Sequence, residues 1–394
     1  MFDFDTVIER RNTASLKWDR YAGQDIIPLW VADMDFRSPP AVLEALRQRV
    51  EHGVFGYSSP PKELVEVVLA MLWHEYGWQV QPEWLVWLPG LVCGLNVSCR
   101  AVGTAGDAVA TFTPVYPPFL TAPGLAGREL ISVPLVEQQD RWVMDLEALE
   151  RSITPRTRLL MLCSPHNPVG RVWSREEQLA LAALVERHNL TVCSDEIHAG
   201  LVLDNDTPHI PFATLTAELA RRTITLLAPS KTYNIPGLGC SFAIIPDKQL
   251  RQAFQGVMAG IVPHVNLLGH TAALAAYRDG EPWRRALLAY LRQNCDLVLE
   301  AVQTMPGLKI WPVEATYLAW IDARGLGMAD PAGLFEQAGV GLSDGAPFGA
   351  PGFVRLNFGC PRSLLQLALE RMQTVCVRKR GSARVWLYRQ VRCI

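Results

Sequence analysis

Short apolar runs alternate with longer amphipathic segments along most of the chain. The runs are rich in Val, Ile, Leu or Thr and are bounded by Pro, Gly, Ser or Asp; they lie at 107–114, 157–165, 190–196, 223–230 and 240–247. Brief, continuous apolar runs of this kind are typical of strands that are buried on both faces of a sheet. Each run is therefore predicted to be a strand.

Amphipathic helices are expected between these strands. The segment 174–189 begins with Ser174 and carries Glu177 three residues later, which is the pattern of a capping box. Its apolar face is formed by Leu179, Leu181, Ala182 and Val185. Strands that alternate with helices predict an α/β fold with a mostly parallel, doubly wound sheet. In such sheets ligands bind beyond the carboxyl ends of the strands.

The pattern changes at about residue 284, where a long helical stretch is followed by two further strand-like runs at 316–323 and 353–361. We interpret this part as a smaller α+β domain that also recruits the N-terminal segment. The predicted division is a large domain at 45–283, a small domain at 1–44 and 284–376, and a basic tail at 377–394. The tail carries Arg378, Lys379, Arg380, Arg384, Arg389 and Arg392 without an acidic residue. A solvated tail is a better explanation of these charges than a nucleic-acid site.

Composition narrows the class of protein. The 394 residues are 49% hydrophobic and 19% charged with a net charge of −2, so no overall field favours nucleic acid or a membrane surface. The N-terminus lacks the pattern of a secretion signal, and no apolar stretch is long enough to span a bilayer. The nine cysteines never form C-x-x-C, which suits a reducing cytoplasm and gives no metal-site spacing. We expect a cytoplasmic enzyme without a metal.

Polar residues follow three successive predicted strands. Asn167 comes after the run at 157–165, and by itself it is more typical of a simple turn than of a functional site. Asp195 ends the run at 190–196, where an acid either caps a helix or pairs with a buried cation. Lys231 follows the run at 223–230 among small and apolar neighbours, where desolvation lowers the pKa of an amine and makes it nucleophilic.

The order of these residues is more informative than any one of them. Because each follows a strand of the same parallel sheet, Asn167, Asp195 and Lys231 are predicted to meet at one edge. Arg355, in the run at 353–361, offers a planar fork for a substrate carboxylate. The sequence thus predicts an active site with a reactive amine, a buried acid and a carboxylate-binding guanidinium.

Four motifs together resemble those of the fold-type I pyridoxal-phosphate (PLP) enzymes: SPHNPVG (164–170), SDEIH (194–198), SKTYNIPG (230–237) and FVRLNFGCPR (353–362). Within that class the chain is similar to the bacterial C–S lyases of the cystathionine β-lyase type, in the class I and II aminotransferase group. The resemblance extends from DFDTVIERR (3–11) to GCPR (359–362). It implies a large PLP-binding domain with a seven-stranded type of sheet, and a smaller α+β domain.

The resemblance also implies roles for individual residues around the cofactor ring. Lys231 carries PLP in an imine bond and then moves protons, while Asp195 pairs with the pyridinium nitrogen. Asn167 binds the phenolic oxygen of the cofactor, and Tyr116 lies against the ring face. His198, where typical aminotransferases have Tyr, is counted among the cofactor-binding residues as in the β-lyase group.

Further roles concern the phosphate, the substrate and a second subunit. The resemblance assigns the phosphate to Ser230 and to the backbone of the turn formed by Gly90, Leu91 and Val92. Tyr57 reaches the phosphate of a neighbouring subunit, which implies a homodimer in which Tyr57 and Tyr116 contribute to catalysis. Arg355 binds the substrate α-carboxylate. Trp30, Phe36 and Tyr57 either face a bulky leaving group or pack at the dimer interface.

The reaction implied by the resemblance is β-elimination from a cysteine S-conjugate. The substrate would be cystathionine or another cysteine thioether or sulfoxide conjugate, as in thiohistidine biosynthesis, and the products a thiol, pyruvate and ammonia. Transamination of the class I and II type is the alternative, because the two reactions diverge only after the Cα proton has left. A regulatory protein that binds a transcription factor is a third hypothesis.

Overall fold

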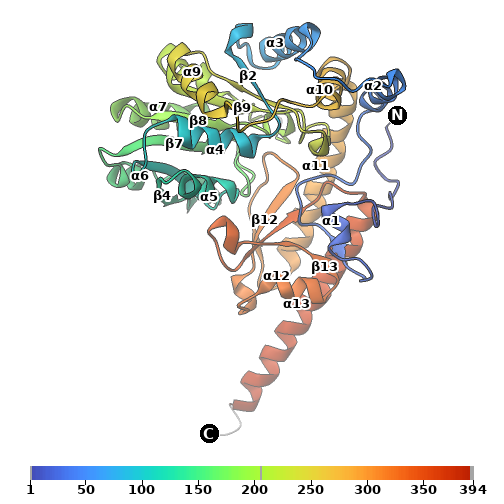
Figure 1. Cartoon of the computed structure of the whole chain (residues 1–394). Coiled ribbons are helices and arrows are strands. Elements are labelled where there is room, and N and C mark those ends of the chain that lie inside the picture. The colour runs from blue at the N-terminus through green and yellow to red at the C-terminus, as the bar shows by residue number, and fades with distance from the viewer. Residues whose placement is uncertain (1, 205, 391–394) are drawn as a thin grey trace.

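The structure is a computed structural model that describes residues 2–204 and 206–390. Its centre is a seven-stranded sheet (Figure 1) with the order β2 (Leu85–Leu88), β10 (Ser241–Ile244), β9 (Thr223–Leu227), β8 (Thr191–Asp195), β7 (Thr157–Cys163), β3 (Ala108–Thr113) and β4 (Glu129–Pro134). Neighbouring strands are parallel except where β10 pairs antiparallel with β2 and β9. All five strands expected from the sequence form within their predicted ranges, and β2 and β4 complete the sheet.

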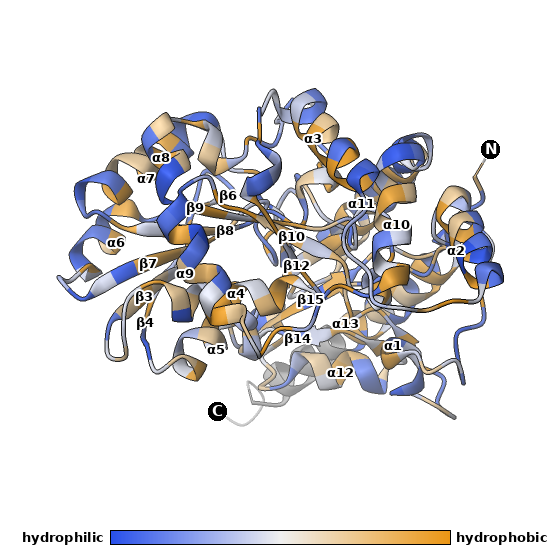
Figure 2. Cartoon of the chain, turned by 45° about the horizontal axis from the view of Figure 1, so that its top comes forward, coloured by the Kyte–Doolittle hydropathy of each residue, from blue (hydrophilic) through white to orange (hydrophobic). Residues whose placement is uncertain are grey.

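Helices cover both faces of this sheet because its strands carry apolar residues on both sides. Val109, Met161 and Ile224 pack with α4 (Leu91–Ala101), α5 (Pro118–Leu125) and α9 (Lys248–Met258). Ala110, Leu160 and Val192 point the other way and pack with α6 (Leu146–Ser152), α7 (Arg175–Arg187) and α8 (Ala217–Arg222). In Figure 2 the orange strands lie between helices whose outer sides are blue. The result is the doubly wound α/β arrangement that the sequence predicts.

The capping box at the start of α7 is confirmed. The Ser174 hydroxyl accepts a hydrogen bond from the Glu177 amide at 3.2 Å, and the Glu177 carboxylate accepts one from the Ser174 amide at 2.7 Å. The described cysteines are free, and all of them except Cys93 are buried. Within the described residues, no helix is both long and apolar enough to cross a membrane.

A second sheet of four strands lies beside the large one (Figure 1), with the order β11 (Lys309–Ile310), β12 (Leu318–Asp322), β15 (Phe353–Asn357) and β14 (Ser343–Asp344). Its pairs are antiparallel, and the helices α11 (Glu281–Thr304), α12 (Pro331–Gln337) and α13 (Arg362–Gln390) pack around it. The end of α13 projects from the body and contains most of the predicted basic tail (Figure 1), whereas Arg392 lies outside the described residues.

The N-terminal segment joins the smaller sheet region before it crosses to the larger one. Residues Leu16–Asp19 form α1, and β1 (Ile27–Pro28) pairs in parallel with β13 (Val340–Gly341). The chain then continues through residues 30–36 into α2 (Pro40–His52), which packs against α10 (Leu267–Asp279) of the larger part. The predicted domain boundaries fall inside α2, α11 and α13, and the division at those positions stays a prediction.

Candidate active site

The predicted residues meet at the carboxyl edge of the large sheet. Asp195 is the last residue of β8, and Lys231 and Asn167 come after β9 and β7. Arg355 approaches from β15 of the smaller sheet, and its Nη1 donates a hydrogen bond to Oδ1 of Asn167 at 3.0 Å. Neighbouring parallel strands end together, so side chains that come directly after them share one edge. The site is therefore built where the two sheets face each other.

Lys231 has an amine that is far less basic than an ordinary lysine. Its Nζ donates a hydrogen bond to the carbonyl oxygen of Ala32 at 2.5 Å. Burial and, to a smaller extent, the nearby Arg355 guanidinium lower its pKa from 10.5 to about 8, although Asp33 and Asp195 act in the opposite direction. A neutral amine is nucleophilic and basic, and a pKa of about 8 leaves about a tenth of Lys231 neutral at pH 7, far more than for an ordinary lysine.

Asp195 is a buried carboxyl group that forms no direct ion pair with a described residue. The residue is 4% exposed, and Oδ1 accepts one hydrogen bond, from the Ile197 amide at 3.1 Å. Burial, aided by the charge of Glu196, raises its pKa to about 7, although the Ile197 amide and the charge of Lys231 act in the opposite direction. A buried acid is costly unless a cation pairs with it. The protonated ring nitrogen of a pyridine would be such a cation, so the residue fits a PLP ring.

His198 and Tyr116 lie beside the same space. Burial lowers the pKa of His198 to about 3, and the positive charges of Lys231 and Arg355 act in the same direction, so its ring is neutral. The buried Nδ1 of His198 has no hydrogen-bond partner in the described structure. Tyr116 comes after β3 and is tied to the Asn167 loop, because its amide donates to the Asn167 carbonyl at 3.1 Å. Burial raises the pKa of the Tyr116 hydroxyl.

The predicted phosphate-binding turn lies at the start of α4. Gly90 is the N-cap of this 11-residue helix, and no side chain caps its first turn. The amides after Gly90, including those of Leu91 and Val92, therefore remain available for an anion. Ser230 directly precedes Lys231 and lies three residues after the end of β9. Donors of this kind fit a phosphate group.

Arg355 is buried and already oriented by protein groups. Its Nη2 donates to the Trp30 carbonyl at 3.0 Å and lies 3.4 Å from the Ser343 hydroxyl, while its Nε has no partner among the described residues. Burial lowers its pKa to about 10. The guanidinium stacks on Phe348, with 4.7 Å between its Cζ and the ring centroid. A guanidinium held in one orientation is suited to binding a carboxylate.

Sequence reasoning missed the residues that hold segment 30–36 over the site. Asn357 donates to the carbonyls of Val31 and Asp33 at 2.5 and 2.7 Å, and the Tyr317 hydroxyl donates to the Ala32 carbonyl at 2.8 Å. The sequence contained a signal for Asn357, which lies two residues after Arg355. Because successive side chains of a strand alternate between faces, these two side chains share one face. Tyr317 precedes a strand as one more buried aromatic residue, and nothing in its local sequence marks it.

Two of the aromatic residues considered for the mouth of the site pack elsewhere. The indole N–H of Trp30 donates to the Lys17 carbonyl at 3.1 Å, and Arg20 covers its ring. Phe36 makes edge-to-face contacts with Phe4 and Tyr290. These contacts favour packing for both rings over contact with a leaving group.

Tyr57, by contrast, is fully exposed on the single chain. Val54, Phe55 and Ile261 are also exposed, and Phe55 and Tyr57 line a groove of about 1310 Å³ together with residues 258–268. Exposed apolar groups of this extent are typical of a surface that another protein covers.

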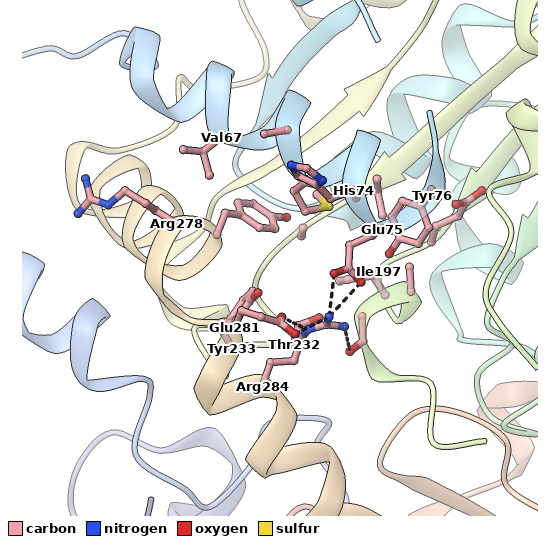
Figure 3. A pocket seen from close by; sticks show the side chains of 18 residues that line it. Val67, His74, Glu75, Tyr76, Ile197, Thr232, Tyr233, Arg278, Glu281 and Arg284 are labelled. Carbon is pink, nitrogen blue, oxygen red and sulfur yellow. Dashed lines mark hydrogen bonds and ion pairs between the residues drawn. The ribbon is translucent and has the colours of Figure 1, made fainter. Parts of the chain in front are cut away.

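A separate cavity of about 330 Å³ lies behind the site, between α3 (Lys62–Tyr76), α10 and α11. Figure 3 shows its side chains, with Arg284 between the carboxylates of Glu75 and Glu281. It borders the active site at Ile197 and Ala228, but Lys231, Asp195 and Arg355 do not line it. It is therefore distinct from the predicted cofactor site.

Comparisons with known proteins agree with this geometry. A family model described as aminotransferase class I and II matches residues 24–372. The chain is 38% identical over 383 residues to the cystathionine beta-lyase PatB of Bacillus subtilis, covering 94% of this chain and 99% of that protein. Among solved structures, OvoB is 50% identical with a TM-score of 0.94, covering 95% of this chain and 99% of that one. Cystalysin of Treponema denticola, which contains PLP, is 33% identical with a TM-score of 0.91, covering 95% and 98%.

Proposed function

The chain belongs to the aminotransferase class I and II family and is a PLP-dependent C–S lyase, and we propose that it cleaves the Cβ–S bond of a cysteine S-conjugate by β-elimination. The observation that carries the proposal is the meeting of Lys231, Asp195 and Arg355 at one edge of the sheet. This reaction requires a reactive amine, a buried acid and a guanidinium that binds the substrate carboxylate.

Bound PLP supplies an electron sink for the electron pair left at the substrate Cα once its nitrogen is protonated. Asp195 would hold the proton on that nitrogen, and Asn167 would donate from Nδ2 to the phenolic oxygen, since its Oδ1 accepts from Arg355. Tyr116 would lie against one face of the ring, and His198 would contribute to the same pocket. The turn at Gly90, Leu91 and Val92, with Ser230, would bind the phosphate.

The substrate is held by Arg355, which binds its α-carboxylate. The neutral amine of Lys231 takes the Cα proton, and a pKa of about 8 makes it an effective base near neutral pH. The Cβ–S bond then breaks, and its electron pair leaves with sulfur. The remaining three-carbon fragment takes up water and yields pyruvate and ammonia.

We propose a homodimer in which Tyr57 of one subunit reaches the phosphate site of the other. The full exposure of Tyr57, and the apolar groups around it, support this arrangement.

Cystathionine and cysteine sulfoxide conjugates, including those of thiohistidine biosynthesis, are the substrates we propose to test. The purified holoenzyme is mixed with L-cystathionine, L-cysteine or a cysteine sulfoxide conjugate, and pyruvate and thiol are measured. Pyruvate formation without an added keto acid supports the lyase. Product formation that depends strictly on a keto-acid acceptor would contradict the proposal and favour transamination.

A further inference from the structure

Two buried donors share one acceptor beside the reactive lysine. Nζ of Lys231 and the hydroxyl of Tyr317 both donate to the carbonyl oxygen of Ala32, at 2.5 and 2.8 Å. Tyr317 is 1% exposed, and burial raises its pKa, so the hydroxyl keeps its proton and acts as a donor. A carbonyl oxygen has two lone pairs. The two donors therefore occupy both acceptor positions of this oxygen.

The Ala32 carbonyl cannot move freely, because its neighbours along the chain are also held. The carbonyls on either side of it, of Val31 and Asp33, both accept from Nδ2 of Asn357. The Trp30 carbonyl accepts hydrogen bonds from the side chains of Ser343 and Arg355. The Met34 carbonyl accepts one from the side chain of Asn234. Side chains thus hold every carbonyl from residue 30 to residue 34.

Close packing and a buried charge also hold the segment 30–36 in place. A Cβ added to Gly359 would lie 2.7 Å from Cγ of Met34, so the segment approaches the backbone as closely as glycine permits. Asp35 is 2% exposed and accepts hydrogen bonds from the Lys17 ammonium and the Trp18 indole, each at 2.8 Å. Removing this buried acid would leave Lys17 with only the more distant Asp33 carboxylate, 3.7 Å from its Nζ, at high cost. The Ala32 oxygen is thus a fixed point in the site.

We propose that Tyr317 is a positioning residue for the amine of Lys231 and acts through the Ala32 carbonyl. A neutral amine that donates one N–H to a fixed acceptor has its lone pair directed away from that acceptor, toward the substrate. Because Tyr317 occupies the second lone pair of the oxygen, the amine is confined to the first. The inference rests on the proposed role of Lys231 as the base that takes the Cα proton, a step common to elimination and transamination.

The test is Tyr317→Phe, which removes only the hydroxyl. We expect kcat with L-cystathionine to fall about tenfold with KM nearly unchanged, because only the base loses its orientation. The kinetic isotope effect on Cα-deuterated substrate should rise. Tyr277→Phe is the matched control, since Tyr277 is a phenol of the separate cavity behind the site.

A second readout needs neither cofactor nor turnover. Competitive acetylation of the cofactor-free protein over a range of pH, followed by peptide mass spectrometry, gives the pKa of the Lys231 amine. With the Tyr317 hydroxyl gone, Ala32 accepts more strongly from the lysine ammonium, which favours the charged form. We expect the pKa in Tyr317→Phe to lie above that of the wild type, and the pKa in Tyr277→Phe to match it.

Equal labelling curves and equal kcat for Tyr317→Phe and wild type would overturn the inference. If the variant does not fold, as judged by circular dichroism, Asn357→Ser removes the clamps on both sides of Ala32 and is expected to change the labelling curve instead. An unchanged curve in that variant would overturn it as well. Failure of the proposed lyase function would appear separately, as a wild-type enzyme that makes no pyruvate.

Discussion

The guanidinium of Arg355 donates a hydrogen bond to the side-chain amide oxygen of Asn167 at 3.0 Å, although the two residues come from different sheets. The contact joins the group proposed to bind the substrate carboxylate to the group proposed to bind the cofactor oxygen. It also fixes the amide of Asn167 with its nitrogen available as a donor. The geometry of substrate binding is therefore coupled to that of the cofactor loop.

Arg355→Lys is expected to raise KM for the amino-acid substrate by about tenfold or more and to lower kcat less. A lysine keeps the charge but cannot bind a carboxylate bidentately while it also contacts Asn167 and Trp30. Steady-state kinetics of pyruvate release give both constants. Arg324→Lys, at an exposed arginine paired with Asp322, is the matched control. An unchanged KM in Arg355→Lys would show that another group binds the carboxylate.

The rate at which the cofactor-free protein takes up PLP should rise with pH and level off above about 8. Only the neutral amine of Lys231 attacks the aldehyde, and its pKa is lowered from 10.5 to about 8. Stopped-flow absorbance at different pH values measures this rate. In Arg355→Leu, where a repelling charge is lost, the plateau should move to higher pH. A wild-type rate that keeps increasing up to about pH 10 would contradict a depressed pKa.

Mixing two inactive variants is expected to restore activity if Tyr57 serves the neighbouring subunit. In a heterodimer of Lys231→Ala and Tyr57→Ala, one of the two sites has both native residues. Random exchange of subunits should recover about a quarter of the wild-type activity. As the control, Lys248→Ala takes the place of Lys231→Ala. Lys248 is an exposed residue at the start of α9, so this variant should be active by itself. Subunit exchange without recovered activity would place Tyr57 outside the shared site.

Glu314 is expected to be important for stability. Its carboxylate accepts hydrogen bonds from Nε of Arg171 at 3.0 Å and from the Val172 amide at 2.8 Å, and both Glu314 and Arg171 are buried. Glu314→Gln should lower the free energy of unfolding by about 2 kcal/mol, because the buried Arg171 guanidinium loses one of its two carboxylate partners and keeps only Glu177. Urea unfolding measures the change. Glu147→Gln, in an exposed pair with Arg151, should leave stability nearly unchanged.

Local sequence was sufficient for the strands of the large sheet and for the polar residues at their carboxyl ends. The runs before Asn167, Asp195 and Lys231 are apolar on both faces, and parallel strands bring the residues at their carboxyl ends to one edge. The capping box of Ser174 and Glu177 was predicted for a similar reason, since it depends on residues three positions apart. The edge strands β2 and β4 were missed, since β2 has only four residues and β4 carries the polar residues Glu129 and Ser132.

The chain's own sequence thus determined the fold class and the set of reactive groups, because both depend on short-range patterns and on motif order. How those groups are held depends on the tertiary structure. Asn357 lies 326 positions from Val31 and Tyr317 lies 285 positions from Ala32, yet these contacts orient the lysine. Hydrogen bonds between such distant segments depend on how the two sheets pack against each other, and no local pattern of apolar and polar residues records that packing.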